Sequence, residues 1–97
     1  MFLKIHRSPD GGDIVAVCDR ELINTTLRTE TMTIMITESF YGSCPATEAE
    51  VTEALKRAGN INLIGERSVS VAAGLGLVDR SCCIMIGKIP HAQVYLL

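Results

Sequence analysis

The chain has 97 residues, which is enough for a single domain over residues 1–97 with one modest hydrophobic core. A hydrophobic fraction of 47% excludes a disordered tail, and no apolar run reaches the roughly 18 residues that cross a membrane. Nine Lys and Arg residues against eleven Asp and Glu residues give a net charge of −2. This balance argues against DNA or a membrane as partner, because binding to phosphates normally requires a strongly basic surface.

The first part of the chain predicts strands. Residues 2–7 alternate apolar and polar side chains, which indicates a half-buried strand. Residues 8–12, with the sequence SPDGG, are typical of a turn, so Ile14–Cys18 is expected to return as the second strand of a hairpin. The nearly continuous apolarity of Ile14–Cys18 predicts a central place in the sheet. A single helical turn at 19–23 and a third strand at 31–37 follow.

The middle of the chain predicts two helices. Thr47 and Glu50 have the spacing of a capping box, and an apolar stripe follows them up to a stop at Gly59. Asn62 can cap a second helix that ends at Gly76, although residues 68–71 also alternate as a strand does. We favour the helix, because the alanines after residue 71 and the Leu-Gly stop fit it.

The last part of the chain predicts a strand at 82–86, a turn at 87–91 and a final strand at 93–97. The full order is then three strands, two helices and two strands. Strands and helices that are separated along the chain in this way predict an α+β fold. We expect a mainly antiparallel or mixed sheet of about five strands, with two helices on one face.

The segment from Asn62 to Arg67 is the first candidate site. The amino terminus of a helix carries free amides and a partial positive charge, and Gly65 lets a ligand approach the backbone closely. The guanidinium group of Arg67 can add a bidentate contact to an anion. The structural alternative is that Asn62 only caps the helix, while Glu66 and Arg67 belong to a solvated first turn.

The segment around His91 and Gln93 is the second candidate site. His91 follows a proline, whose restricted backbone suits a positioned proton donor or hydrogen-bonding group. No Ser-His-Asp arrangement can be argued from the spacing, so we assign no catalytic residue. We favour a non-enzymatic protein and leave enzymatic activity open.

The aromatic pair Phe40 and Tyr41 is the third candidate site. Exposed rings can stack on a base or anchor a protein partner, whereas buried rings would close one end of the core. We expect Phe40 to be buried, and Tyr41 is open to either role. His6, on the polar side of the first strand, is expected at the surface.

The four cysteines at 18, 44, 82 and 83 form no C-x-x-C pair. The amino terminus turns polar after five residues, unlike a secretory signal, so we expect a cytoplasmic protein with reduced thiols. We expect no cofactor and no metal. A zinc site built from Cys44, His6, His91 and another thiol is the alternative.

Segments along nearly the whole chain resemble an archaeal family, the domain of unknown function 424. They are FLKIHR (2–7), VAVCD (15–19), ESFYG (38–42), NLIGERSV (62–69), GLVD (76–79) and GKIPHAQV (87–94). The resemblance implies an archaeal cytosolic protein of unassigned activity, often described as RNA-binding and linked to translation genes. It highlights Tyr41, Gly42, Asn62, Gly65, Glu66, Arg67, Pro90, His91 and Gln93. It does not say which of them bind a ligand.

Three functions are compatible with these observations. The one that we favour is a non-enzymatic domain that associates with RNA or the ribosome. The runner-up is a protein-interaction or self-associating module, in which the terminal AQVYLL strand offers an edge to a partner protein or to a second copy in a homodimer. The third is a small anion-binding enzyme that uses residues 62–67 together with His91. A common site requires the segments around Tyr41, Asn62 and His91 to meet.

Overall fold

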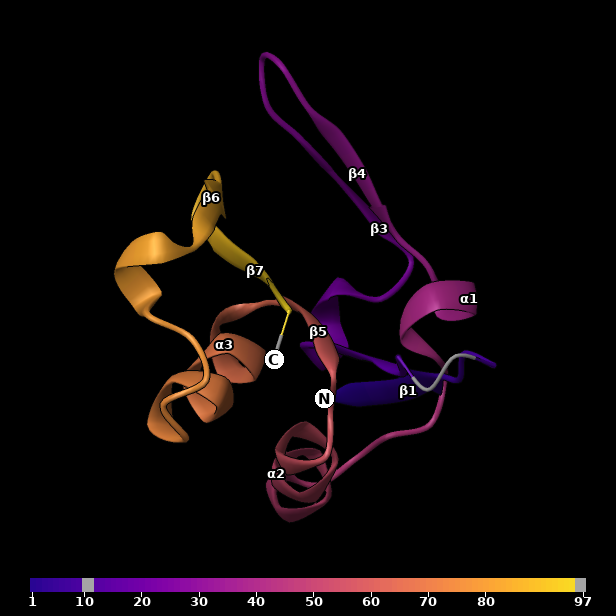
Figure 1. Ribbon diagram of the computed structural model, residues 1–97. Coiled ribbons are helices and arrows are strands. Elements are labelled where there is room, and N and C mark those ends of the chain that lie inside the picture. The colour runs from indigo at the N-terminus through magenta and orange to yellow at the C-terminus, as the bar shows by residue number, and fades with distance from the viewer. Residues whose placement is uncertain (10–11, 96–97) are drawn as a thin grey trace.

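The main sheet has five strands in the order β1-β2-β5-β7-β6 in the computed structural model, which describes residues 1–9 and 12–95 (Figure 1). The strands are β1 (Phe2–His6), β2 (Ile14–Cys18), β5 (Asn60–Ile64), β6 (Ile84–Ile86) and β7 (Ile89–Tyr95). β2 and β5 are parallel, and the other neighbours are antiparallel. The mixed sheet confirms the predicted α+β class. The β1–β2 hairpin and the central place of β2 are confirmed as well.

Two helices, α2 (Glu48–Lys56) and α3 (Glu66–Gly74), cover one face of this sheet, as predicted. The capping box begins α2: Thr47 N donates to Glu50 Oε1 (3.0 Å), and Glu50 N donates to Thr47 Oγ1 (3.1 Å). The core on this side joins residues of β2 and β5 to residues of both helices and of β7. Its buried members are Val15, Val17, Val51, Leu55, Ile61, Leu63, Val69, Ala72 and Ala92.

A second, smaller core covers part of the opposite face. A hairpin of β3 (Thr25–Arg28) and β4 (Thr33–Ile36) forms a separate two-stranded sheet, which rises away from the main sheet in Figure 1. The short helices η1 (Arg20–Leu22) and α1 (Glu38–Tyr41) flank it, and η2 (Arg80–Cys82) precedes β6. This core contains Ala16, Cys18, Leu22, Ile36, Tyr41, Ile64 and Ile86. The strand predicted at 31–37 is present as β4, but it belongs to this separate sheet and does not join the main one.

The prediction that Asn62 caps the second helix is wrong. Asn62 lies in the middle of β5, and the helix begins at Glu66, after Gly65. The segment NINLI alternates with a period of two, and its apolar residues Ile61 and Leu63 pack under the helices. The helix that continues through Ser68 is confirmed, so the strand alternative for residues 68–71 is excluded.

The expectations for the end of the chain need smaller corrections. Pro90 and His91 lie inside β7 and not in a turn, because the chain reverses at Gly87, whose φ is +64°. The strand predicted at 82–86 covers only Ile84–Ile86, after η2. Residues 96–97 of the last predicted strand, and residues 10–11 of the first predicted turn, lie outside the described residues.

Of the aromatic pair, Phe40 is less buried than expected, and Tyr41, which was open to either role, is the buried ring. Tyr41 is buried, with 4% of its surface exposed, whereas Phe40 is half-buried and stacks on the ring of His6 (centroids 4.8 Å apart). His6 is half-buried, and its Nε2 donates to the carbonyl oxygen of Phe40 (2.6 Å). The stacked pair therefore holds α1 against β1.

The four cysteines are free thiols with very different environments, which allows a direct test. Cys18 is fully buried in β2, and desolvation raises its pKa to about 11. At about pH 8, we expect a thiol reagent to label the exposed Cys44 and Cys82 rapidly and Cys18 only after unfolding, because the reactive thiolate is scarce and shielded. Peptide mass spectrometry after timed labelling measures this order. Equal labelling rates at Cys18 and Cys44 would contradict it.

No helix in residues 1–9 and 12–95 has the length and apolar character needed to cross a membrane.

Candidate functional site

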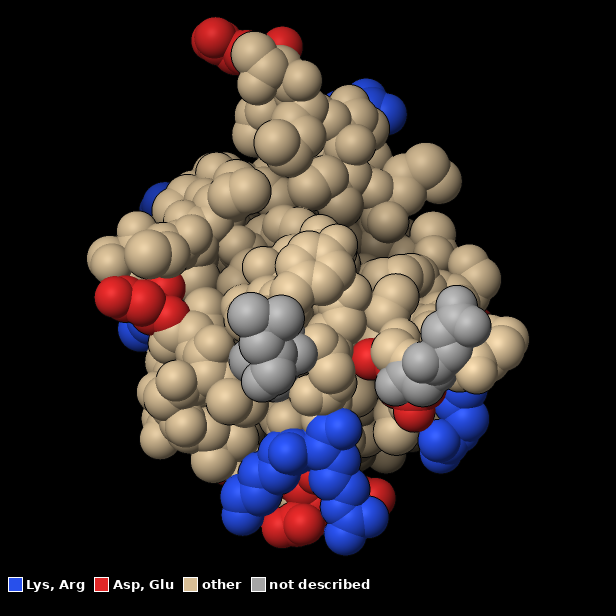
Figure 2. All heavy atoms as spheres, in the orientation of Figure 1, with Lys and Arg blue, Asp and Glu red and all other residues tan. Residues whose placement is uncertain are grey.

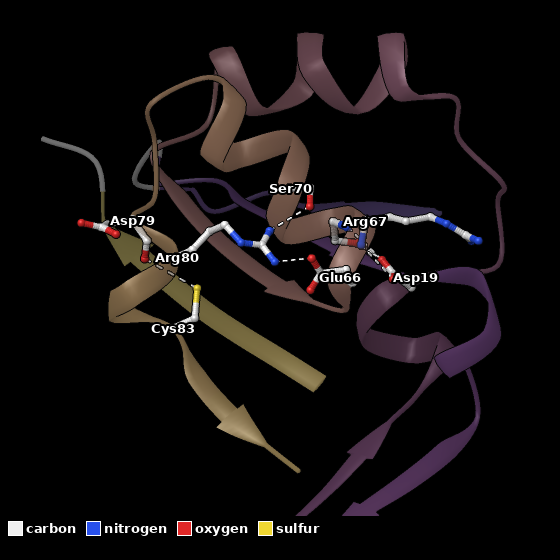
Figure 3. Close-up of polar contacts among 8 residues, drawn as sticks. Asp19, Glu66, Arg67, Ser70, Asp79, Arg80 and Cys83 are labelled. Carbon is white, nitrogen blue, oxygen red and sulfur yellow. Dashed lines mark hydrogen bonds and ion pairs between the residues drawn. The ribbon is translucent and has the colours of Figure 1, made fainter. Parts of the chain in front are cut away.

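The amino terminus of α3 is filled by a carboxylate of the chain itself. Asp19, which follows β2, is 3% exposed and lies against the first turn of α3 (Figure 3). Its Oδ2 accepts from Arg67 N (3.0 Å), and its Oδ1 accepts from Ser68 N and Ser68 Oγ (2.8 Å each). These are the free amides that would otherwise bind an anion. A ligand anion at this helix end would have to displace Asp19.

Gly65 makes this arrangement possible. Its φ is +112°, and an added Cβ would lie 2.5 Å from Asp19 Oδ1 and 2.7 Å from Asp19 Cβ. The backbone cannot easily move away, because Gly65 N donates to Pro90 O (2.9 Å) and Asp19 N donates to Ile64 O (3.1 Å). The glycine therefore lets an internal carboxylate, and not a ligand, approach the backbone.

The charged side chains at this helix end are engaged in surface contacts. Arg80 of η2 bridges α3, with Nη2 paired to Glu66 Oε1 and Nη1 donating to Ser70 Oγ (2.8 Å) (Figure 3). Arg67 extends in the other direction and pairs with Glu21 Oε2 (3.4 Å). Both pairs are solvent-exposed, so each stabilises the fold by about 1 kcal/mol or less. Their effect is to tie η1 and η2 to the start of α3.

The remaining predicted site residues meet on the sheet face opposite α2 and α3. Asn62 of β5 pairs with Gln93 of β7, and the next same-face residue of β7 is His91, which pairs with Ile64. Tyr41 reaches Asn62 from α1, and its hydroxyl donates to Asn62 Oδ1 (2.6 Å). The segments around Tyr41, Asn62 and His91 thus come together, whereas Gly65, Glu66 and Arg67 lie past the end of β5.

Two further residues of this surface were missed in the sequence. Asn60 lies two residues before Asn62 on the same face of β5, and it pairs with Tyr95, which is 70% exposed. The alternation of NINLI contains the signal for Asn60, once that segment is read as a strand. We call the surface formed by Asn60, Asn62, His91, Gln93 and Tyr95, together with the buried Tyr41 that is hydrogen-bonded to Asn62, the neutral face.

The neutral face carries hydrogen-bonding groups and aromatic rings but no formal charge at neutral pH. His91 is half-buried, and desolvation lowers its pKa, so its imidazole is uncharged there. Lys4 of β1 lies on the same side of the sheet, but its ammonium group donates to Ser39 O (2.8 Å). In Figure 2 the middle of the view is largely tan, and most blue and red spheres stand at its margins.

A buried polar atom of the neutral face, Asn60 Oδ1, has no hydrogen-bond partner among the described residues. Such an acceptor costs about 1–3 kcal/mol when it is desolvated. In contrast, the amide of Asn62 is held in place by the buried Tyr41, whose pKa is raised above its ordinary value by desolvation. The Tyr41 phenol is therefore a hydrogen-bond donor that orients Asn62.

Removing the Tyr41 hydroxyl tests this positioning. We expect Tyr41→Phe to lower the free energy of unfolding by about 1–2 kcal/mol, because a short bond to Asn62 Oδ1 is lost inside the protein. The matched control is Tyr95→Phe, whose exposed hydroxyl has only a 3.4 Å contact from Gln93 Nε2 and whose loss should change stability by less than about 0.5 kcal/mol. Urea unfolding of both variants makes the comparison, and equal losses would contradict it.

Metal ligands do not gather in the part of the chain that the structure describes. No group of three or more His, Cys, Asp or Glu side chains in residues 1–9 and 12–95 has the arrangement of a metal site. The zinc alternative is not supported, since Cys44, His6 and His91 do not form such a group.

Comparisons with known proteins agree with the resemblance seen in the sequence. A solved structure of an uncharacterized conserved protein from Methanopyrus kandleri is similar, with 28% sequence identity and a TM-score of 0.81 over 99% of this chain and 90% of that chain. No protein of curated function matches significantly. The model of the family described as "Protein of unknown function (DUF424)" matches residues 6–97. Because the match covers nearly the whole sequence, the chain belongs to the DUF424 family.

Proposed function

We propose that the protein is a non-enzymatic interaction module that binds a partner protein through the neutral face. The observation that carries the proposal is the composition of this surface: amide side chains, an uncharged imidazole and an exposed tyrosine, with Ile84 exposed beside His91. Protein interfaces typically combine aromatic and apolar anchors with uncharged hydrogen-bonding groups. The partner surface that fits is therefore likewise uncharged and mixed polar and apolar.

Association with RNA or the ribosome, which we favoured from the sequence, requires contacts to phosphates. The neutral face offers no free cation for such contacts, and the guanidinium groups of Arg67 and Arg80 are already paired with Glu21 and Glu66. The net charge of −2 also disfavours a free nucleic acid as partner. These observations support the protein partner over RNA, and RNA is an outcome of the test below.

The small anion-binding enzyme is the weakest of the three functions. It needs the helix terminus at residues 65–68 to receive a ligand, but Asp19 already accepts hydrogen bonds from Arg67 N and Ser68 N. We therefore place the function on the neutral face and assign a structural role to the start of α3.

The test is affinity capture from native lysate, with and without nuclease, by the wild type and two charge variants. Tyr95→Glu puts a carboxylate on the neutral face, and Ala49→Glu makes the same change on the exposed first turn of α2, behind the sheet. We expect one protein to be retained after nuclease treatment by the wild type and Ala49→Glu and to be lost with Tyr95→Glu. A protein retained equally by all three would overturn the proposal, as would capture that nuclease abolishes, which would indicate RNA.

A further inference from the structure

The outer edge of β7 is only partly covered. β6 pairs with Ile89–His91 alone, so in the described residues no strand lies beside Ala92–Tyr95 on that side (Figure 1). A cavity of about 310 Å³ adjoins this stretch, and it is lined by residues of the loop after α3, by Ile84 and by residues 91–94 of β7. The loop therefore does not fill the space beside this part of β7, although it borders that space.

The register of β7 shows which backbone groups face this opening. Gly65 N donates to Pro90 O (2.9 Å), so Pro90 directs its backbone toward β5. Backbone groups in an antiparallel strand alternate in direction, so Ala92 and Val94 also face β5. Gln93 and Tyr95 then present their N–H and C=O groups to the open edge. Among the described residues, no strand pairing and no loop hydrogen bond engages these four groups.

The opposite edge of the sheet is covered at the start of β1. Pro45 forms a bridge to Phe2 of β1, and Ala46 N donates to Met1 O (2.8 Å). Gly42 also lies against the backbone of Leu3, where an added Cβ would be 3.1 Å from the carbonyl oxygen. On the other side of the sheet, the outermost strand β6 has only the three residues Ile84–Ile86, so Ala92–Tyr95 of β7 is the longer stretch without a neighbouring strand in the described residues.

The exposed pattern on β7 is complementary to itself. A two-fold axis through Val94 would place Gln93 opposite Tyr95 of the second copy, and Tyr95 opposite Gln93 of the second copy. Each of these pairs exchanges two backbone hydrogen bonds, so every outward group of both residues acquires a partner. All side chains from Ile89 to Tyr95 are uncharged at neutral pH, so the two paired strands carry no like charges; the charged residue in the cavity lining is Asp79.

We propose that the protein forms a homodimer in which the β7 strands of two copies pair antiparallel through Gln93 and Tyr95, joining the five-stranded sheets into one continuous sheet. The dimer uses the backbone edge of β7 and does not depend on the proposed partner of the neutral face. An isologous pairing of this kind closes on itself, since both edges are consumed.

The test compares two substitutions of Gln93 that both remove its side chain but differ in whether the outward backbone N–H is kept. Gln93→Pro removes the outward N–H but no bond to β5, and proline is tolerated at such edge positions. Gln93→Ala removes the side chain and keeps the N–H. Sedimentation equilibrium from about 10 µM to about 1 mM gives the dissociation constants of the dimers. We expect Gln93→Pro to weaken the dimer about tenfold or more and Gln93→Ala to change it by less than about threefold, because two symmetric hydrogen bonds are lost only in the first.

Hydrogen exchange of the wild type gives a readout that does not rely on a variant. We expect the amides of Gln93 and Tyr95 to become protected as concentration rises, while those of Ala92 and Val94 are protected throughout. A molecular mass of one chain over the whole range, with Gln93 and Tyr95 amides exchanging freely, would overturn the dimer. Equal weakening by Gln93→Pro and Gln93→Ala would overturn the strand pairing.

Discussion

Gly65→Ala is expected to destabilise the protein by about 3 kcal/mol or more, which is a large fraction of the stability of a domain of this size. The new Cβ would lie 2.5 Å from Asp19 Oδ1, and the φ of +112° is strained for any residue with a side chain. Hydrogen bonds from Gly65 N and Asp19 N fix both backbones, so neither can move without losing a contact. Guanidinium unfolding followed by circular dichroism measures the loss.

Gly74→Ala is the matched control for this substitution. Gly74 is the last residue of α3, has no atom within 4 Å of an added Cβ, and does not have a positive φ. We expect it to leave stability unchanged or to raise it by up to about 1 kcal/mol, because alanine favours the helix over glycine. A similar loss in both variants would show that the contact with Asp19 is not the cause.

Asp19→Ala is the second substitution with a large expected effect. It removes an acceptor from Arg67 N, Ser68 N and Ser68 Oγ, and at least the two groups of Ser68 are buried. Donors left unpaired inside a protein cost about 1–3 kcal/mol each, so we expect a loss of about 3 kcal/mol or more. The control is Glu21→Ala, which breaks only the exposed pair with Arg67 and should cost less than about 0.5 kcal/mol. Thermal and urea unfolding compare the two, and equal losses would contradict the capping role.

The two sites are expected to interact. Removing the Asp19 carboxylate vacates much of the space that the Gly65→Ala methyl group would enter. The double variant should therefore be more stable than the sum of the two single losses predicts. This coupling would confirm that a single contact between the end of β2 and the start of α3 underlies both effects.

Much of the fold could be predicted because its signals are local. The hairpin of β1 and β2 and the capping box of α2 each lie within a short window, and both are present. β3 was missed because the segment TTLR is only four residues long and half polar, so its pairing with β4 depends on contacts and not on composition. The start of α3 was misplaced because apolar residues of β5 also fit a helical spacing.

The candidate site was harder to predict than the fold. The contact between Tyr41 and Asn62 could not be predicted from their spacing, because 21 residues separate them. The family resemblance singles out both residues but does not say that they touch. Asp19 and Ser68 are 49 residues apart, and no local pattern shows that the carboxylate would occupy the helix terminus. The sequence therefore indicated an anion site at residues that the tertiary structure uses for its own stability.

The most direct test of the functional assignment compares two positions by photo-crosslinking in native lysate. The photoreactive residue p-benzoylphenylalanine would replace Tyr95, on the neutral face, or Arg67, at the start of α3. We predict that the first position crosslinks to a partner protein of defined mass, in addition to a second copy of the chain, and that the second position yields no such product. Crosslinks from Arg67 to a protein or to RNA, with none from Tyr95 beyond the dimer, would contradict the account.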